Sequence, residues 1–323
     1  MPNRPPYTPE LAQALAAFPE APLLNADSLP FWRSLAFGEK SIRAALGNDL
    51  VHTEHLVGGV DGNEIVLSMV RSATPEAAAP VVYMIHGGGM VAGDRFGGFN
   101  EYDMAGWVRR LGVVIVTPEY RLAPDSPAPS GVYDCYSGLA WVAAHANELG
   151  IDPTRIIVGG ISGGAGLAAG AALMAREPGG PQLLAQLLIC PQLDDRNDSV
   201  SAGQYVSADG VRAIWPRENN AFAWDAVLGA DHATRADIPP HSAPGRAIDL
   251  SGLPQAFIDA GSAELFRDEA VAYASRLWAS GVQAELHVWA GGFHGFEIVA
   301  PTARVSTAAR ETREGWLGRV LAP

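Results

Sequence analysis

The sequence has few cysteines, few charged residues and no long apolar run. Its two cysteines, Cys135 and Cys190, lie far apart in apolar surroundings. Neither a disulfide framework nor a cysteine-based metal site is therefore expected, and we predict buried free thiols in a reducing, cytoplasmic location. Charged residues make up only 18% of the chain and hydrophobic residues 48%. This composition is typical of a folded globular protein and argues against disorder.

The chain also lacks the features expected of proteins that act on membranes or nucleic acids. Residues 1–6 have no apolar core of signal-peptide type. No stretch approaches the roughly 18 uninterrupted apolar residues that a membrane span needs. The net charge of −13 disfavours nucleic acid and anionic membranes as partners. We expect a small-molecule partner and no membrane span, and we leave open whether the protein forms a homodimer.

Apolar stretches alternate with helical patterns along most of the chain. Eight of them are predicted to be strands: 52–58, 64–70, 80–85, 112–117, 155–158, 184–189, 255–260 and 284–289. The first two alternate in polarity and are joined by an Asp-Gly turn, which predicts an antiparallel pair. The later stretches are mostly separated by helical segments. The pattern predicts an α/β fold with a mostly parallel, doubly wound, eight-stranded sheet.

Two segments do not follow this alternation. Residues 1–47 are predicted to form two amphipathic helices, over 9–18 and 28–47. Residues 191–250 contain a polar bend and several aromatic side chains. We expect 1–47 and 191–250 to build a helical cap over a catalytic domain of residues 48–190 and 251–323. Packing in a small core of their own would account for the same aromatic side chains equally well.

The central motif is GISGG at residues 160–164. It follows an apolar, β-branched stretch at 155–158 and precedes a helix-forming run of small residues at 165–175. Strand, glycine turn, serine and helix are the context of a nucleophile elbow, in which glycines leave room for a serine at a strained turn. The N-terminus of the following helix favours negative charge. Ser162 is therefore the predicted nucleophile.

A second glycine-rich motif, HGGG at residues 86–89, directly follows the predicted strand 80–85. Such a loop can aim several N–H groups at one oxygen, because glycine allows the backbone to approach closely. We predict that Gly88, Gly89 and Gly163 donate hydrogen bonds to an oxyanion. The alternative is a phosphate-binding loop, but the loop lacks both the P-loop lysine and the G-x-G-x-x-G spacing.

The remaining catalytic groups should follow the last two strands. His294 is the predicted base because it lies in a glycine-flanked loop after the final strand. The acid should follow the preceding strand and bind the other imidazole nitrogen. Glu264 lies in the loop there and is favoured over Asp259, which lies within the strand. Asp268 and Glu269 begin the next helix, where carboxylates stabilise the N-terminus.

These motifs resemble the hormone-sensitive-lipase-like family of α/β-hydrolase esterases, over about residues 50 to 300. HGGGM at 86–90 resembles the family's oxyanion loop, YRLAP at 120–124 its next motif, and GISGG its GDSAG elbow. ELFRDE at 264–269 is similar to the family's DPLRDE, which implies that Glu264 takes the place of the usual aspartate. The resemblance implies an α/β-hydrolase fold whose cap combines the N-terminus with an insertion after the sixth strand.

Residues and resemblance together predict a serine carboxylesterase that hydrolyses short- to medium-chain acyl esters. Ser162, His294 and Glu264 would form its triad, and no metal or cofactor is expected because water completes the reaction. The expected substrate-pocket residues are Met90, Trp215, Phe222 and Trp224. Amidase, lactonase or acyltransferase chemistry on the same triad stays open. A non-catalytic receptor of the same fold is disfavoured because this chain keeps all three groups.

Overall fold

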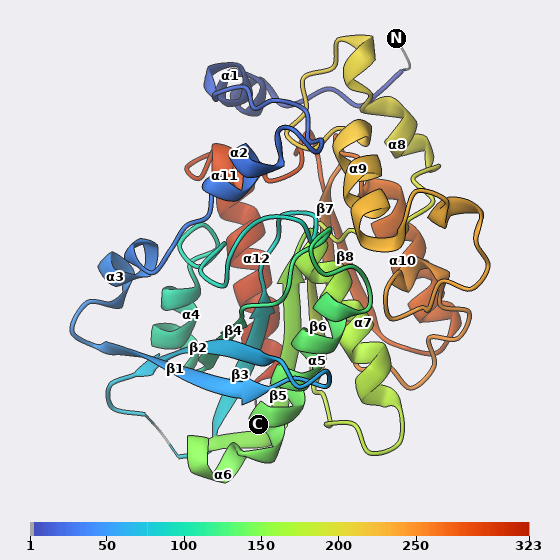
Figure 1. Ribbon diagram of the computed structural model, residues 1–323. Coiled ribbons are helices and arrows are strands. Elements are labelled where there is room, and N and C mark those ends of the chain that lie inside the picture. The colour runs from blue at the N-terminus through green and yellow to red at the C-terminus, as the bar shows by residue number, and fades with distance from the viewer. Residues whose placement is uncertain (1–2, 76, 323) are drawn as a thin grey trace.

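Eight strands form a sheet with the order β1-β2-β4-β3-β5-β6-β7-β8 (Figure 1). The computed structural model describes residues 3–75 and 77–322. The strands are β1 (Leu50–Gly58), β2 (Glu64–Ser72), β3 (Ala79–Ile85), β4 (Val114–Pro118), β5 (Ile151–Ile161), β6 (Ala185–Ile189), β7 (Gln255–Gly261) and β8 (Ala284–Trp289). β2 pairs antiparallel with β1 and β4, and the strands from β4 to β8 pair in parallel. The predicted mostly parallel sheet with an antiparallel edge is confirmed.

Alternate side chains of the central strands face two different apolar cores. In β3, Val81 and Tyr83 face one core, whereas Val82 and Met84 face the other. The first core is covered by α5 (Ser130–Ala144), α7 (Gly163–Arg176) and α10 (Arg267–Ala279), and the second by α4 (Met104–Leu111) and α12 (Arg304–Val320). Burial on both faces explains why the sequence of β3 is continuously apolar.

The described residues form seven further α-helices. They are α1 (Pro9–Ala17), α2 (Leu29–Ser34), α3 (Lys40–Leu46), α6 (Ala146–Leu149), α8 (Val200–Gln204), α9 (Arg217–Leu228) and α11 (Phe296–Val299). Figure 1 shows α1, α2, α8 and α9 at the same end of the molecule, above the sheet. The four helices α1, α2, α8 and α9 come from the segments 1–47 and 191–250, whose assignment to a separate cap stays a prediction.

The prediction of one continuous helix in the N-terminal segment is wrong. The pattern over residues 28–47 predicted a single helix, but the structure has α2 and α3 with a non-helical connection between them. Gly38, in that connection, has φ of +67°, which a right-handed helix does not allow. The periodicity on either side continued across the break, so the apolar pattern alone did not reveal it.

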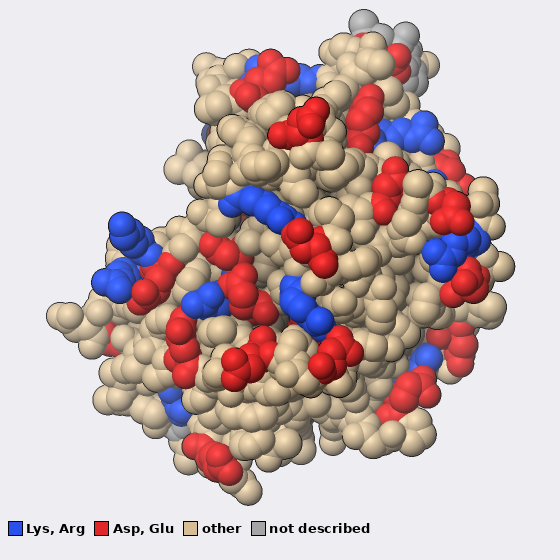
Figure 2. Space-filling model, in the orientation of Figure 1, with Lys and Arg blue, Asp and Glu red and all other residues tan. Residues whose placement is uncertain are grey.

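The acidic excess is not gathered into one patch on the face shown in Figure 2. Acidic and basic side chains are intermixed there, and the net charge is −13. Ion pairs at the surface join many of the charged side chains of the protein, for example Arg110 with Glu314 and Arg109 with Asp49. Such exposed pairs contribute little to stability individually.

A buried ion network joins α12 to the end of β7 and to α11. Arg313 Nη2 lies 2.7 Å from Asp259 Oδ2 and 3.0 Å from Glu297 Oε2. All three side chains are almost completely buried. Burial raises the pKa of Glu297, and the Arg313 guanidinium opposes that rise. Each charge in this network therefore depends on the others for compensation.

We predict that Arg313→Met lowers the free energy of unfolding by about 3–5 kcal/mol, because two carboxylates lose their buried counter-charge. Burial already raises the pKa of Glu297, and loss of the Arg313 guanidinium should raise it further, so stability is lost as the pH rises through this folded-state pKa. The deficit should thus be larger near pH 8 than near pH 5. Urea unfolding of Arg313→Met and of the unchanged protein at both pH values measures this deficit in the free energy of unfolding.

The matched control is Arg319→Met on the same helix. Arg319 is 60% exposed and pairs with Glu285 at the surface, so the loss should stay below about 1 kcal/mol. Equal losses in the two variants, or a deficit that does not widen with pH, would contradict the role of the buried network.

Candidate active site

Strand pairing brings the sequence motifs to one edge of the sheet. β3 and β5 are neighbours, with Ile85 opposite Gly160, so the HGGG loop and the elbow leave the sheet side by side. β7 and β8 are also neighbours, with Gly261 opposite Trp289, so the two following loops also meet. The chain runs from β3 to β4 on one side and then to β5 on the other. A sheet of this kind opens a crevice at such a switch point.

Ser162 occupies the strained turn between β5 and α7. Its φ and ψ are 56° and −120°, a combination that side-chain-bearing residues rarely adopt. Its N–H donates to the Ile189 carbonyl at 2.8 Å. A Cβ on Gly160 would lie 2.2 Å from the Gly164 oxygen, and one on Gly164 would lie 2.2 Å from the His86 oxygen. The backbone is too close at both positions for any residue but glycine.

Ser162, His294 and Glu264 form one line of hydrogen bonds. Ser162 Oγ lies 3.0 Å from His294 Nε2, and His294 Nδ1 lies 2.6 Å from Glu264 Oε2. The exposed fractions are 6% for Ser162, 9% for His294 and 2% for Glu264. The second oxygen of Glu264 accepts the Gly261 N–H at 2.5 Å. The arrangement fixes the imidazole so that Nε2 can take a proton from the serine hydroxyl.

The other carboxylates considered from the sequence have different partners. Asp259 accepts a hydrogen bond from Arg313, and no hydrogen bond joins it to His294 within residues 3–75 and 77–322. Asp268 and Glu269 accept hydrogen bonds from backbone N–H groups in the segment 193–201. Burial raises the pKa of Glu269 well above its usual value. These two carboxylates therefore attach the insertion to α10.

The HGGG loop presents unused N–H groups beside the serine. Gly88 and Gly89 have φ of +105° and +62°, which turns the backbone sharply after β3. A Cβ on Gly163 would lie 3.0 Å from the Gly89 nitrogen, which shows how close the two turns are. Nothing in the described part of the chain accepts a hydrogen bond from the N–H of Gly88, Gly89 or Gly163. These donors are free to bind an oxygen of a ligand.

His86 braces this loop. Its ring stacks on Tyr120 with centroids 4.2 Å apart, and the Tyr120 hydroxyl donates to the His86 carbonyl at 3.1 Å. Burial lowers the pKa of His86, which keeps the ring neutral. Arg121, the next residue of the YRLAP motif, makes hydrogen bonds of 2.8 Å to both carboxylate oxygens of the buried Asp134. Tyr120 therefore supports the HGGG loop, and the pair of Arg121 with Asp134 fixes the YRLAP motif that carries Tyr120.

Sequence reasoning missed the contacts between the N-terminal segment and the same loop. Arg33 donates to the carbonyls of Val91 and Ala123 at 3.0 and 3.1 Å. The Gly38 N–H donates to Asp94 Oδ2 at 2.7 Å. The GD pair after HGGG was a visible signal for Asp94, whereas a single arginine on an amphipathic helix gave none for Arg33.

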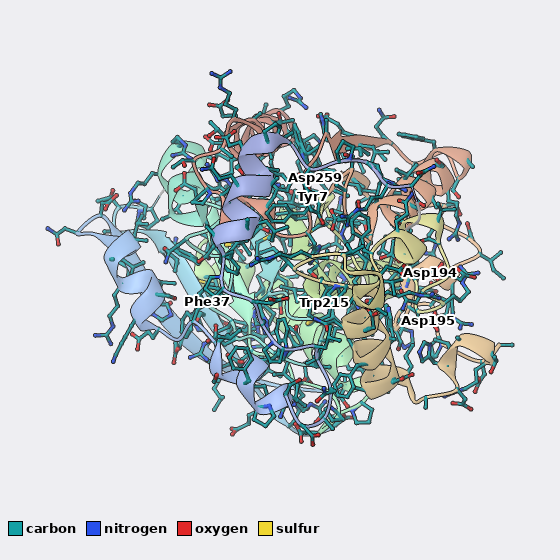
Figure 3. All side chains as sticks on the ribbon, turned by 90° about the horizontal axis from the view of Figure 1, so that it is seen from above. Tyr7, Phe37, Asp194, Asp195, Trp215 and Asp259 are labelled. Atoms are coloured by element: carbon teal, nitrogen blue, oxygen red, sulfur yellow. The ribbon has the colours of Figure 1, made fainter. Side chains whose placement is uncertain are left out.

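A cavity of about 280 Å³ opens onto Ser162 and His294. Of the four predicted pocket residues, Trp215 lines it. Met90 lines a small separate cavity, Phe222 packs half-buried on the main core, and Trp224 is fully buried there. Aromatic side chains from the N-terminal segment line the cavity as well: Phe18, Trp32 and Phe37. Figure 3 shows Phe37 and Trp215 as they lie seen from above.

Comparisons with known proteins agree with this geometry. A profile described as alpha/beta hydrolase fold matches residues 81–298. Carboxylesterase NlhH of Mycobacterium tuberculosis is 36% identical over 239 residues, which are 71% of this chain and 70% of that protein. Esterase LipI of the same organism is 32% identical over 303 residues, 87% of this chain and 89% of that protein. The solved structure of a bacterial heroin esterase has a TM-score of 0.88 at 36% identity and covers 98% of each chain.

We predict that Gly164→Ala lowers kcat/KM by at least about 100-fold, because the new methyl group would displace the HGGG loop or the elbow. The measurement is ester hydrolysis by protein whose folded state is checked by circular dichroism. Gly315→Ala is the control, since a Cβ there meets its nearest atom at 3.8 Å. Similar activity in the two variants would show that the close packing at Gly164 does not matter for catalysis.

Proposed function

We propose that Ser162, His294 and Glu264 act as a catalytic triad, because the chain belongs to the alpha/beta hydrolase family and is a carboxylic ester hydrolase. The observation that supports these roles most directly is the continuous line of hydrogen bonds from Glu264 through His294 to Ser162. The line ends in a cavity, where a substrate carbonyl can approach the serine hydroxyl.

In the proposed reaction, Ser162 Oγ attacks the ester carbonyl while His294 Nε2 takes its proton. Glu264 stays ionised, holds Nδ1–H and stabilises the imidazolium that forms. His294 then gives the proton to the alcohol oxygen as the C–O bond breaks, which leaves an acyl-enzyme on Ser162. Water attacks the acyl-enzyme with His294 again as base. The acid is released and the serine hydroxyl is restored.

The N–H groups of Gly88, Gly89 and Gly163 are proposed to hold the oxyanion of each tetrahedral intermediate. They have no other acceptor among the described residues, and they are fixed before substrate arrives. In another serine hydrolase, one such donor contributes about 3–4 kcal/mol to transition-state stabilisation. The N-terminus of α7 adds a favourable dipole at the same place.

Short- to medium-chain acyl esters are the proposed substrates. The cavity of about 280 Å³ is just below the size of pockets that hold drug-sized ligands, and its lining is mostly apolar. A small, uncharged ester fits those properties. Amidase, lactonase and acyltransferase activities would use the same groups, and a panel of amides, lactones and acceptor alcohols separates them from ester hydrolysis.

Assembly and location stay predictions. None of the helices in residues 3–75 and 77–322 is both long and apolar enough to cross a membrane. A cytoplasmic location is proposed on the sequence arguments alone, and whether the chain forms a homodimer stays open. Light scattering of the purified chain tests the dimer.

We predict that Ser162→Ala lowers kcat for p-nitrophenyl butyrate by at least about 10⁵-fold, because no nucleophile remains. Labelling by a fluorophosphonate should be lost at the same time. Ser275→Ala, on the exposed side of α10, should keep both activity and labelling. Undiminished turnover in Ser162→Ala would exclude Ser162 as the nucleophile.

A second prediction separates the two carboxylates considered for the acid. Glu264→Gln should lower kcat by about 10³–10⁴-fold, because the neutral amide cannot stabilise the imidazolium. Asp259→Asn should keep kcat within about tenfold but lower the melting temperature, because the Arg313 network is weakened. Steady-state kinetics and thermal unfolding of both variants test this. If Asp259→Asn alone abolishes activity, Glu264 is not the acid.

A further inference from the structure

The cavity at Ser162 adjoins a larger one beneath the N-terminal segment. This outer cavity has a volume of about 740 Å³ and lies between residues 15–35 and residues 207–219. Four apolar side chains line both cavities: Phe18, Trp32, Leu35 and Ile214. We call these four the shared wall. The two residues that follow Ile214 each line one cavity: Trp215 lines the cavity at Ser162, and Pro216 lines the outer cavity.

The shared wall is held less firmly than the core around it. Phe18 is 39% exposed and Leu35 is 51% exposed, and Trp32 and Ile214 are half-buried. Trp215 differs, because it is only 6% exposed and its ring packs against Gly89 of the HGGG loop. Phe18 and Leu35, the exposed members of the shared wall, can therefore change rotamer without disturbing the packed core. The two cavities can then connect while the catalytic groups stay in place.

One member of the shared wall, Ile214, lies on the histidine side of the serine. Ile214 and Val299 pack on an apolar cluster that contains Phe293 and Phe296, on either side of the loop that carries His294. His294 must give its proton to the departing oxygen. The alcohol part of the ester therefore lies near His294, on the side where Ile214 separates the two cavities.

The lining of the outer cavity is mostly uncharged. Glu20 and Arg212 are the charged side chains among the described residues that line it. The Arg212 guanidinium donates to the carbonyls of Ala16 and Phe18, at the end of α1. Its charge is thus already engaged by the protein. A volume of about 740 Å³ lies within the range that holds drug-sized ligands.

We propose that the outer cavity is a subsite for the alcohol part of the substrate. The preferred substrates would then be esters of a short acid with a large, uncharged, aromatic or alicyclic alcohol. The acyl group stays in the cavity at Ser162, and the alcohol passes the shared wall. This proposal rests on the proposed function of the same site and adds the side on which the bulk of the substrate lies.

The test compares kcat/KM for biphenyl-4-yl acetate with kcat/KM for phenyl acetate. Ala21→Trp and Ala213→Trp place a large ring in the outer cavity from opposite sides. Each should lower the biphenylyl-to-phenyl ratio at least about tenfold, because the bulky alcohol loses its space. Leu35→Ala should raise the ratio by opening the shared wall. Ala36→Trp is the control, since Ala36 is exposed and lines neither cavity.

Each result has a defined meaning. A ratio that is unchanged in both tryptophan variants overturns the subsite. The assignment to the alcohol is also overturned if the variants instead lower the ratio of p-nitrophenyl octanoate to p-nitrophenyl acetate, because the acyl chain then fills the cavity. Two variants on opposite walls guard against one of them failing to fold. Failure of the proposed function would appear separately, as phenyl acetate hydrolysis that survives Ser162→Ala.

Discussion

The close approach of two backbone turns at the edge of β3 and β5 is the constraint on which the rest of the site depends. A Cβ on Gly164 would lie 2.2 Å from the His86 oxygen, and one on Gly163 would lie 3.0 Å from the Gly89 nitrogen. Because backbone meets backbone, the serine and the free N–H groups are positioned without any flexible side chain between them. Electrostatic preorganisation of this kind costs no rearrangement during the reaction. The strained Ser162 conformation persists because the surrounding contacts leave the turn no alternative.

The proposed base and acid, His294 and Glu264, need support of a different kind, since they lie on loops far along the chain from Ser162. Glu264 uses one oxygen on the Gly261 N–H and the other on His294, so the longer glutamate folds back onto its own loop and still reaches the imidazole. Beneath them, Arg313 binds Asp259 at the end of β7 and Glu297 just after His294. The ends of both loops are therefore anchored to one buried side chain. Asp259, the alternative acid, belongs to that support.

Sequence alone predicted the parts of the site that the backbone determines. HGGG and GISGG are local motifs whose glycines are required wherever the turns occur, so the two turns could be predicted without knowledge of distant contacts. The choice between Glu264 and Asp259 needed the side-chain directions, which spacing does not give. The pocket lining depended on how residues 1–47 pack against 191–250. Trp224 is as apolar as Trp215, yet it turns into the core while Trp215 faces the cavity.

The cavity lining and the proposed oxyanion donors are in direct contact in this protein. Arg33 binds the carbonyl of Val91, just beyond the HGGG loop, from the helix that carries Trp32 of the shared wall. A Cβ on Gly89 would lie 2.6 Å from the Trp215 ring, so this indole supports one of the proposed oxyanion donors while it closes the cavity. A change at Trp215 that enlarges the cavity therefore also loosens a donor. Leu35 contacts both cavities, lies at the surface, and is free of that coupling, which makes the outer part of the shared wall the place where specificity can vary without loss of catalysis.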